Sequence, residues 1–113
     1  MTWETQLREE MARAAKSLFD RGYTAGSSGN ISTVCGDDLL MTPTNSCLGF
    51  LDPARISKIT RDGRHLSGDA PSKEVFLHQA FYDTRANTGA VVHLHSTYAT
   101  LLSCLKETNP QDA

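Results

Sequence analysis

The stretch "GSSGNISTVCGDDLLMT", residues 26–42, contains the first two predicted strands of the fold. It begins as a loop of small residues and enters a short strand near Ile31–Val34. Gly36–Asp38 is a turn signal, and the run "LLMT" at residues 39–42 has the composition of a second strand. We therefore predict that the two strands pair as an antiparallel hairpin, to which the rest of the domain is added.

Two segments have the spacing of amphipathic helices. Residues 70–85, "APSKEVFLHQAFYDTR", predict a helix with Ser72 as its N-cap. Its expected apolar face consists of Phe76, Leu77, Ala80 and Phe81. Residues 3–21 predict an earlier helix whose apolar positions recur three and four residues apart, at Leu7, Met11, Ala14, Ala15 and Leu18.

The remaining elements complete a layered order. Asp52-Pro53 is a typical helix start, and residues 56–60 predict a strand. The apolar run "AVVHLHS", residues 90–96, predicts a strand in the centre of the sheet, and Thr97 or the serine before it would cap a third helix. The order of helix, strands, helix, strand and helix predicts an α/β domain.

The size and charge of the chain argue against several classes of protein. With 113 residues there is room for one small domain. A net charge of −2 with scattered lysines and arginines argues against nucleic acid as a partner. No apolar stretch approaches the roughly 20 residues that span a bilayer, and the polar N-terminus lacks the apolar core of a signal peptide. Three widely spaced cysteines without a CxxC pair indicate a reducing compartment, so we expect a cytoplasmic protein.

Two histidines in "VVHLHS", residues 91–96, could bind a metal. His93 and His95 stand two positions apart in a predicted strand, so they share a face and lie about 6.5–7 Å apart at Cα. Both imidazoles could then reach one zinc ion at about 2.0–2.1 Å. The spacing also fits two unrelated strand histidines, one of them hydrogen-bonded in a core, and by itself it leaves both interpretations open.

Other polar groups are ambiguous when taken singly. Glu74 lies at the predicted start of a helix, where a carboxylate favours the helix dipole with or without a chemical role. The loops "GSSGN" (26–30) and "TPTN" (42–45) offer hydroxyls and backbone N–H groups that could cradle a phosphate, although neither has the P-loop pattern and each could be an ordinary turn. We expect His65 to be exposed and His78 to pack or to lie on the surface.

These signals occur in one order along the chain: "GSSGNIS", "TPT", "PSKE" and "AVVHLHS". In this combination the sequence resembles the class II aldolase/adducin family, zinc lyases that act on small sugar phosphates. Within it, "RGYTAGSSGNIS", "TPTNSCLGFLDP" and "LSGDAPSKE" are most similar to the 3-oxo-tetronate 4-phosphate decarboxylases. The resemblance implies a three-layer α/β/α domain with a central, largely antiparallel sheet flanked by helices. Residues 1–113 would form the N-terminal portion of one such domain, which is therefore truncated.

The resemblance also implies roles for individual residues. Glu74 would be the acid/base carboxylate, and His93 and His95 would be two ligands of Zn²⁺. The phosphate and substrate pocket would be lined by Gly29, Asn30, Thr44, Asn45, Ser72 and Lys73. The sugar-phosphate aldolases often have glycine in place of Asn45 and serine in place of Lys73. A lysine supplies a point charge for a phosphate or carboxylate, which favours an acid substrate.

The implied reaction is decarboxylation of 3-oxo-tetronate 4-phosphate to dihydroxyacetone phosphate and CO2 through a metal-stabilised enediolate. A class II aldolase of the fuculose- or ribulose-phosphate type would pass through the same kind of enediolate. A non-catalytic adducin-like protein, or a truncated and inactive fragment, is the remaining alternative. The implied partners are a small phosphorylated sugar acid and further copies of the chain, assembled as a homotetramer.

One expected metal ligand is missing from the sequence. The family supplies a third histidine from a later segment, and neither His65 nor His78 has matching context. A catalytic zinc site normally has three protein ligands and one open position. We therefore expect the 113-residue chain alone to bind zinc weakly, to have little activity and to need a complementary chain or an oligomer to cover its sheet edges.

Overall fold

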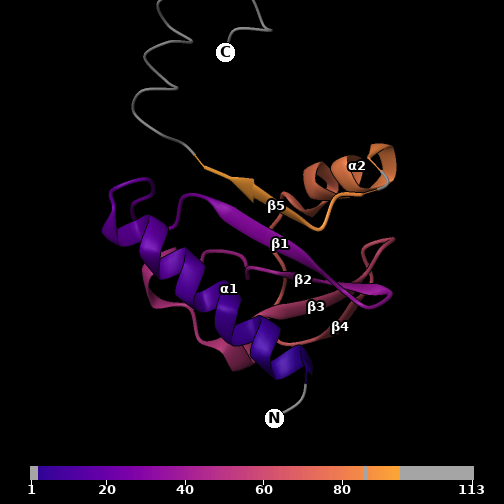
Figure 1. The fold of residues 1–113 in the computed structure, drawn as a ribbon, viewed down its shortest axis with the longest axis horizontal. Helices are drawn as coiled ribbons and strands as arrows, with labels where there is room; N and C mark the ends of the chain where they lie inside the picture. Colours follow the sequence, from indigo (N-terminus) through magenta and orange to yellow (C-terminus); the bar gives the residue numbers. More distant parts are fainter. Residues whose placement is uncertain (1–2, 86, 95–113) are drawn as a thin grey trace, which may run out of the picture.

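The computed structural model describes residues 3–85 and 87–94, and the predicted third helix lies outside them (Figure 1). None of the helices in these ranges is both long enough and apolar enough to cross a membrane. The described elements, in chain order, are α1 (Trp3–Asp20), β1 (Asn30–Cys35), β2 (Asp38–Met41), η1 (Leu48–Phe50), η2 (Pro53–Arg55), β3 (Ser57–Thr60), β4 (His65–Ser67), α2 (Val75–Thr84) and β5 (Ala90–His93), where η marks a 3-10 helix.

The predicted hairpin lies at the heart of the sheet. β1 and β2 pair antiparallel, from Ser32 opposite Met41 to Cys35 opposite Asp38. The sheet has the order β4-β3-β2-β1-β5, and each neighbouring pair of described strands is antiparallel. The hairpin and the largely antiparallel sheet are therefore confirmed.

β5 lies at the edge of the described sheet, where the sequence predicted a central strand. Within the described residues it pairs with β1, and Val92 keeps 52% of its surface exposed. This strand order concerns the described residues alone, so the central position predicted for the complete domain stays a prediction.

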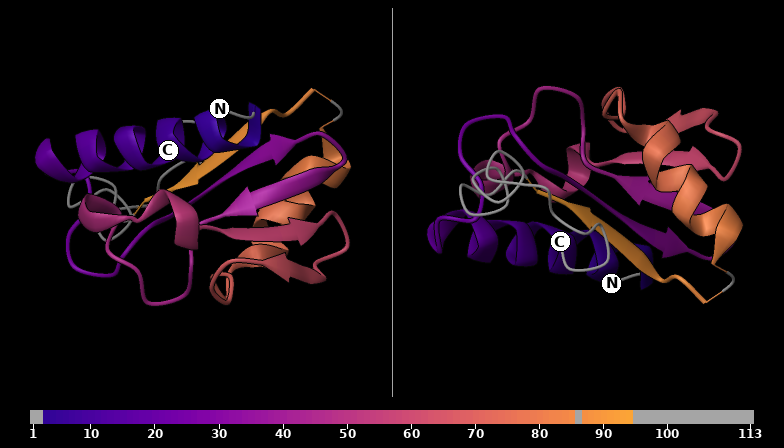
Figure 2. Two further views of the ribbon diagram at one scale, coloured as in Figure 1. Left: turned by 90° about the horizontal axis from the view of Figure 1, so that it is seen from below. Right: turned by 90° about the horizontal axis from the view of Figure 1, so that it is seen from above.

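One helix covers each face of the sheet, which gives three α/β/α layers (Figure 2). Successive strand residues point to opposite faces, so neighbouring side chains join different hydrophobic clusters. Leu40 packs with Met11 and Ala15 of α1, whereas Leu39 and Met41 pack on the side of α2. The predicted fold class is confirmed.

α1 ends one residue before its predicted limit. Of the predicted stripe, Met11 and Ala15 are buried, Leu7 and Leu18 are half-buried against the same core, and Ala14 is exposed. The periodicity missed Arg8, which is buried in the same face. Its Nη1 donates to the backbone oxygens of Pro53 at 3.0 Å and Ile56 at 2.6 Å. These two bonds fasten α1 to the η2 turn and to the residue that follows it.

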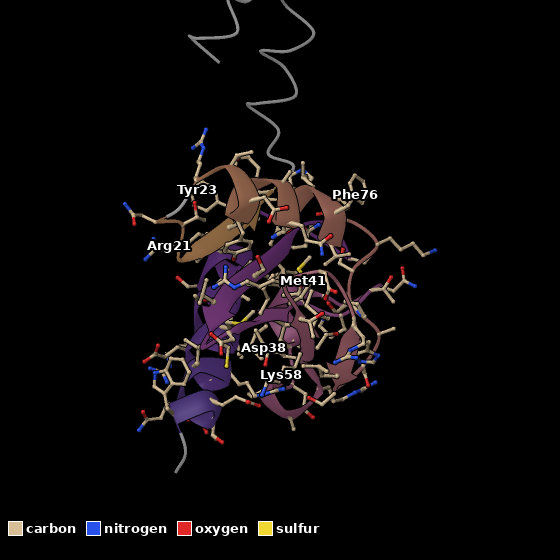
Figure 3. The ribbon with its side chains drawn as sticks, turned by 90° about the vertical axis from the view of Figure 1, so that its right-hand side faces the viewer. Arg21, Tyr23, Asp38, Met41, Lys58 and Phe76 are labelled. Atoms are coloured by element: carbon tan, nitrogen blue, oxygen red, sulfur yellow. The ribbon has the colours of Figure 1, made fainter. Side chains whose placement is uncertain are left out.

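The face of α2 that covers the sheet differs from the predicted one. Phe76 is 68% exposed and points away from the sheet (Figure 3), and Phe81 is exposed as well. The buried residues are His78 and Tyr82, both of which hydrogen-bond to Ser32. Hydrophobicity gave the wrong face because polar side chains can occupy the inner side of a helix when their hydrogen bonds are satisfied.

The start of α2 was also displaced from the prediction. The helix begins at Val75 with Glu74 in the cap position, two residues after Ser72. Ser72 Oγ still accepts the backbone N–H of Glu74 at 3.2 Å, so the serine supports the turn that leads into the helix. The predicted cap at Asp52 is confirmed for the short η2 turn, since its side chain accepts the N–H of Ala54 at 3.0 Å.

Candidate active site

Three segments that carry predicted site residues meet beside the start of β1. The N–H of Ile31 donates to Thr42 Oγ1 at 3.1 Å, and the N–H of Thr42 donates to the oxygen of Ile31 at 2.9 Å. The segment before α2 joins them through the N–H of Ser72, which donates to the oxygen of Thr42 at 3.0 Å. Backbone pairing therefore gathers the segments at residues 29–31, 42–45 and 70–74.

Glu74 is in contact with two further predicted site residues. Its Oε2 accepts a hydrogen bond from Asn30 Nδ2 at 2.9 Å and lies 2.5 Å from His93 Nδ1. The register of the sheet sets this geometry, because Asn30 in β1 stands opposite His93 in β5. The side chain of Glu74 is 40% exposed and that of His93 is 28% exposed, so solvent reaches the pair.

A row of buried polar side chains lies behind Glu74. Asn30 Oδ1 contacts His78 Nε2, His78 Nδ1 lies 2.6 Å from Ser32 Oγ, and Ser32 Oγ lies 2.7 Å from the Tyr82 hydroxyl. All four side chains are buried, and among the described residues no buried side-chain nitrogen or oxygen lacks a hydrogen-bond partner. We call these four residues the polar row.

The buried position of His78 determines its charge. Burial lowers the pKa of His78 to about 4; the neighbouring His93 acts in the same direction, and Glu74 acts against both. His78 is therefore neutral near pH 7, because a buried imidazole avoids the cost of carrying a charge away from water.

Sequence reasoning missed Ser32, His78 and Tyr82 as parts of the site. A signal was present in the spacing. Asn30 and Ser32 are two positions apart and share a strand face, and His78 and Tyr82 are four positions apart and share a helix face. Two such pairs of polar residues can form a buried network only where the helix covers that strand, which the spacing alone does not establish.

The predicted substrate-binding residues lie in the gathered segments. Thr44 and Asn45 line a cavity of about 230 Å³, and an isolated bridge between Pro43 and Pro71 places that cavity next to the segment leading to Glu74. Lys73 and Asn45 are exposed, whereas Ser72 and Thr44 are half-buried.

Gly29 has a structural requirement of its own. Its φ of +85° is a conformation that favours glycine, and a Cβ at this position would come within 3.1 Å of Thr24 Oγ1 and 3.2 Å of Leu48 Cδ1. A side chain at this position would therefore distort the loop that leads into Asn30.

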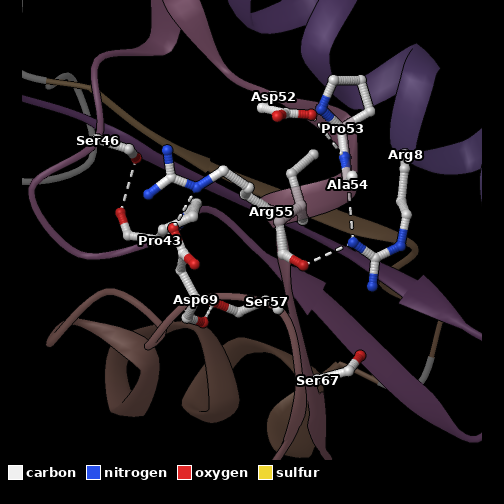
Figure 4. Close-up of polar contacts among 12 residues, drawn as sticks. Arg8, Pro43, Ser46, Asp52, Pro53, Ala54, Arg55, Ser57, Ser67 and Asp69 are labelled. Carbon is white, nitrogen blue, oxygen red and sulfur yellow. Dashed lines mark hydrogen bonds and ion pairs between the residues drawn. The ribbon is translucent and has the colours of Figure 1, made fainter.

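The loop around the cavity is fastened by side-chain contacts (Figure 4). Ser46 Oγ donates to the backbone oxygen of Pro43 at 2.7 Å, and Arg55 forms an ion pair with Asp69 at 2.8 Å. Ser57 Oγ donates to the backbone oxygen of Asp69. These contacts fix the walls of the cavity relative to the start of β3.

Of the two predicted metal ligands, His93 is described, and His95 lies outside the described residues. Within residues 3–85 and 87–94, no group of three or more histidine, cysteine, aspartate or glutamate side chains is placed to hold an ion. His93 Nδ1 faces a carboxylate that accepts a hydrogen bond, which puts the lone pair of a neutral ring on Nε2. Metal-binding histidines commonly have one nitrogen held by a carboxylate in this way, so His93 fits the role of one zinc ligand.

The sequence profile described as "Class II Aldolase and Adducin N-terminal domain" matches residues 9–113. The chain belongs to this family. The 3-oxo-tetronate 4-phosphate decarboxylase of Escherichia coli O6:H1 (strain CFT073) is 60% identical over 104 residues, which cover 91% of this chain and 49% of that protein. The protein of the same name from Cupriavidus necator is 48% identical over 112 residues, which cover 99% of this chain and 52% of its relative.

A solved structure agrees with these relatives. The crystal structure of YgbL from Escherichia coli superposes with a TM-score of 0.92 at 54% identity, covering 96% of this chain and 53% of that one. The fold is therefore that of the class II aldolases. The chain spans about half the length of the curated relatives it matches. The family resemblance is confirmed, and the roles of individual residues remain predictions.

Proposed function

We propose that the intact protein decarboxylates 3-oxo-tetronate 4-phosphate and releases CO2 and dihydroxyacetone phosphate. The observation that carries this proposal is the position of the Glu74 carboxylate, in contact with Asn30 and His93 beside the gathered loops. The names of the most similar relatives supply the substrate. Because the chain spans about half of those relatives, the proposal concerns the protein that carries the complete domain.

The gathered segments offer groups for a phosphorylated acid. Lys73 is exposed and its ammonium suits a phosphate or a carboxylate as a point charge. The hydroxyls of Thr44 and Ser72 and the amide of Asn45 would bind oxygen atoms of the substrate. Gly29 would contribute through its backbone, because its φ of +85° sets the turn of the loop that leads into Asn30.

His93 and His95 would hold zinc together with a ligand that this chain does not contain. Zinc, when bound, would supply Lewis-acid stabilisation of the negative charge that develops on the 3-oxo oxygen. Glu74 would support this arrangement from the protein side, since its contact with Nδ1 fixes both the tautomer and the orientation of the His93 ring.

The proposed step breaks the bond between carbons 1 and 2 of the substrate. Carbon 1 leaves as CO2, and the electron pair stays on carbon 2, delocalised toward the 3-oxo oxygen as an enediolate. Glu74, protonated or acting through a water molecule, would deliver a proton to carbon 2 and so complete dihydroxyacetone phosphate. The half-exposed carboxyl could then recover a proton from solvent.

A sugar-phosphate aldolase is the second candidate, since the matching family is described by that activity. Its reaction would also leave an enediolate, but the leaving group would be an aldehyde. Glu74 and His93 would serve either reaction in the same positions. The lysine at position 73 and the asparagine at position 45 favour the decarboxylase.

One assay separates these candidates. The intact protein is loaded with zinc and incubated with 3-oxo-tetronate 4-phosphate, while CO2 and dihydroxyacetone phosphate are measured. We expect both products in equal amounts, and their loss when a chelator removes the metal. A zinc-loaded sample that releases no CO2 contradicts the decarboxylase, and release of an aldehyde from a ketose phosphate identifies the aldolase.

We also propose that the intact protein is a cytoplasmic homotetramer. This proposal rests on membership of the family whose profile matches residues 9–113. Sedimentation equilibrium of the intact protein tests this, and a monomer at micromolar concentration would contradict it.

A further inference from the structure

The polar row runs from the interior of the protein to Glu74. Its members follow the order Tyr82, Ser32, His78 and Asn30, and the last of them contacts the Glu74 carboxylate. Each member has 8% or less of its surface exposed. The direction of every hydrogen bond in the row can be worked out from the chemistry of the two ends.

The amide of Asn30 sets the direction. An ionised carboxylate only accepts hydrogen bonds, so the group that lies 2.9 Å from Glu74 Oε2 is the amide nitrogen. The amide oxygen then faces His78 Nε2, and because that oxygen only accepts, Nε2 must carry a proton. Turning the amide over would place its oxygen against the ionised carboxylate, so that two hydrogen-bond acceptors would face each other.

The same reasoning extends to Tyr82. A neutral imidazole with its proton on Nε2 has a lone pair on Nδ1, so the Ser32 hydroxyl donates to it across 2.6 Å. Ser32 Oγ then accepts from the Tyr82 hydroxyl across 2.7 Å. Burial lowers the pKa of His78 to about 4 and raises the pKa of Tyr82, which keeps both groups in the neutral forms that this pattern requires.

We propose that His78 and Ser32 are positioning residues for Glu74 and act through Asn30. All four hydrogen bonds point the same way, so each polarises the next and the Asn30 amide is held with its donor toward the carboxylate. Both ends of that amide are engaged within the protein, which fits an orienting role for Asn30. The inference rests on the proposed acid/base role of Glu74 and adds how that carboxylate is kept in one orientation.

The tautomer of His78 tests the row without any substrate. The intact protein is labelled with 15N-histidine, and a two-bond proton–nitrogen correlation spectrum is recorded near pH 7.5. The His78 signals are assigned by their loss in His78→Gln. We expect a neutral ring with the proton on Nε2; a proton on Nδ1, or a charged ring, overturns the proposed direction of the row.

Kinetics then test whether the row acts through Glu74. We expect His78→Phe to lower kcat about 10- to 100-fold with KM changed less than about threefold, because a misplaced catalytic group slows the step without weakening binding. His78→Gln, which keeps one donor and one acceptor, should recover most of the rate. His65→Phe is the matched control, since that histidine is exposed in β4 and its ring contacts only backbone oxygens among the hydrogen bonds described, and we expect it to change neither constant.

The decisive comparison is made in a Glu74→Gln background. If His78 works through Glu74, His78→Phe should cause no further loss of the residual rate there, because the two effects are coupled. An equal loss in both backgrounds overturns the proposal. If His78→Phe does not fold, the rates of Ser32→Ala are compared in the same two backgrounds. Full activity of Glu74→Gln alone would contradict the proposed function, whereas the tautomer measurement would still decide the row.

Discussion

Oε2 of Glu74 and Nδ1 of His93 lie 2.5 Å apart, although 19 positions separate the two residues in the chain. Glu74 occupies the N-cap position of α2 and His93 ends β5, so the contact joins a helix start to a strand end. One carboxylate would then serve two purposes: it orients a metal ligand and it exchanges a proton with the substrate. Separate substitutions can remove each purpose.

Glu74→Gln should abolish proton transfer and spare the metal. The amide oxygen of glutamine still accepts from His93 Nδ1, whereas the side chain can no longer carry an acidic proton. We expect kcat of the zinc-saturated intact protein to fall at least about 100-fold, with zinc content unchanged by metal analysis. Glu10→Gln, at an exposed position of α1, is the control. Full activity in Glu74→Gln would remove this residue from the mechanism.

His93→Ala should have the opposite profile. Loss of a residue that hydrogen-bonds a metal ligand typically weakens metal binding roughly 10- to 100-fold. Loss of one of the three proposed ligands themselves should weaken zinc binding by more than that. Competition with a chromogenic chelator measures the affinity of the intact protein. His65→Ala provides the control at an exposed histidine. Unchanged zinc affinity in His93→Ala would show that the metal, if bound, lies elsewhere.

His78 should make the stability of the protein depend on pH. Its pKa is about 4 in the folded chain, against 6.5 for the free side chain, because burial disfavours the charged ring. Between these values the unfolded chain binds more protons, so the free energy of unfolding falls as the pH falls from 6.5 toward 4. We expect His78 to cost about 2 kcal/mol at pH 5 relative to pH 7.5.

Urea unfolding of the intact protein at both pH values measures this cost. The same experiment on His78→Gln supplies the reference, because glutamine has no charge to gain while the rest of the sequence is the same. The difference between the two proteins in their loss of stability isolates His78. Equal losses would show that this imidazole is not held neutral by the fold.

Much of the fold could be predicted because local signals agreed with the tertiary structure. The turn at Gly36–Asp38 and the strand composition on either side of it gave the hairpin and its pairing. α1 followed from spacing alone, since an amphipathic helix on a sheet buries a single stripe. The inner face of α2 could not be predicted in this way, because His78 is a polar residue that is buried with its hydrogen bonds satisfied. Tyr82 packs with Leu39 and Met41 while its hydroxyl bonds to Ser32.

The candidate site, like the fold, could be predicted from the sequence only in part. Glu74 and His93 belong to short motifs with a recognisable order, and the two side chains are in contact in the structure. Their chemical roles stay predictions. Ser32 ends the motif "GSSGNIS" without being singled out there, and Tyr82 belongs to no motif. The role of both depends on the packing of α2 over β1. Position along the sequence could not reveal them, because the polar row combines residues of β1 and α2. Ser32 and Tyr82, for example, are 50 positions apart in the chain.

Arg8 should contribute to stability through backbone oxygens rather than through its surface charge. Its Nη1 supplies hydrogen bonds to Pro53 and Ile56, and its Nε pairs with Glu4 at 3.0 Å. Arg8→Met keeps much of the aliphatic packing but leaves the two carbonyls with no donor from this side chain. We expect the free energy of unfolding to fall by about 3–6 kcal/mol, because two hydrogen bonds from a charged donor are lost and each is worth about 1.5–3 kcal/mol.

Arg13→Met is the matched control for this substitution. Arg13 lies on the same helix but is exposed, so its replacement should change stability by no more than about 0.5 kcal/mol. Urea unfolding of both variants in the intact protein gives the comparison. If the two variants lost equal stability, the loss would come from the change in charge or helix propensity. The hydrogen bonds from Arg8 to the η2 turn would then contribute nothing measurable to the free energy of unfolding.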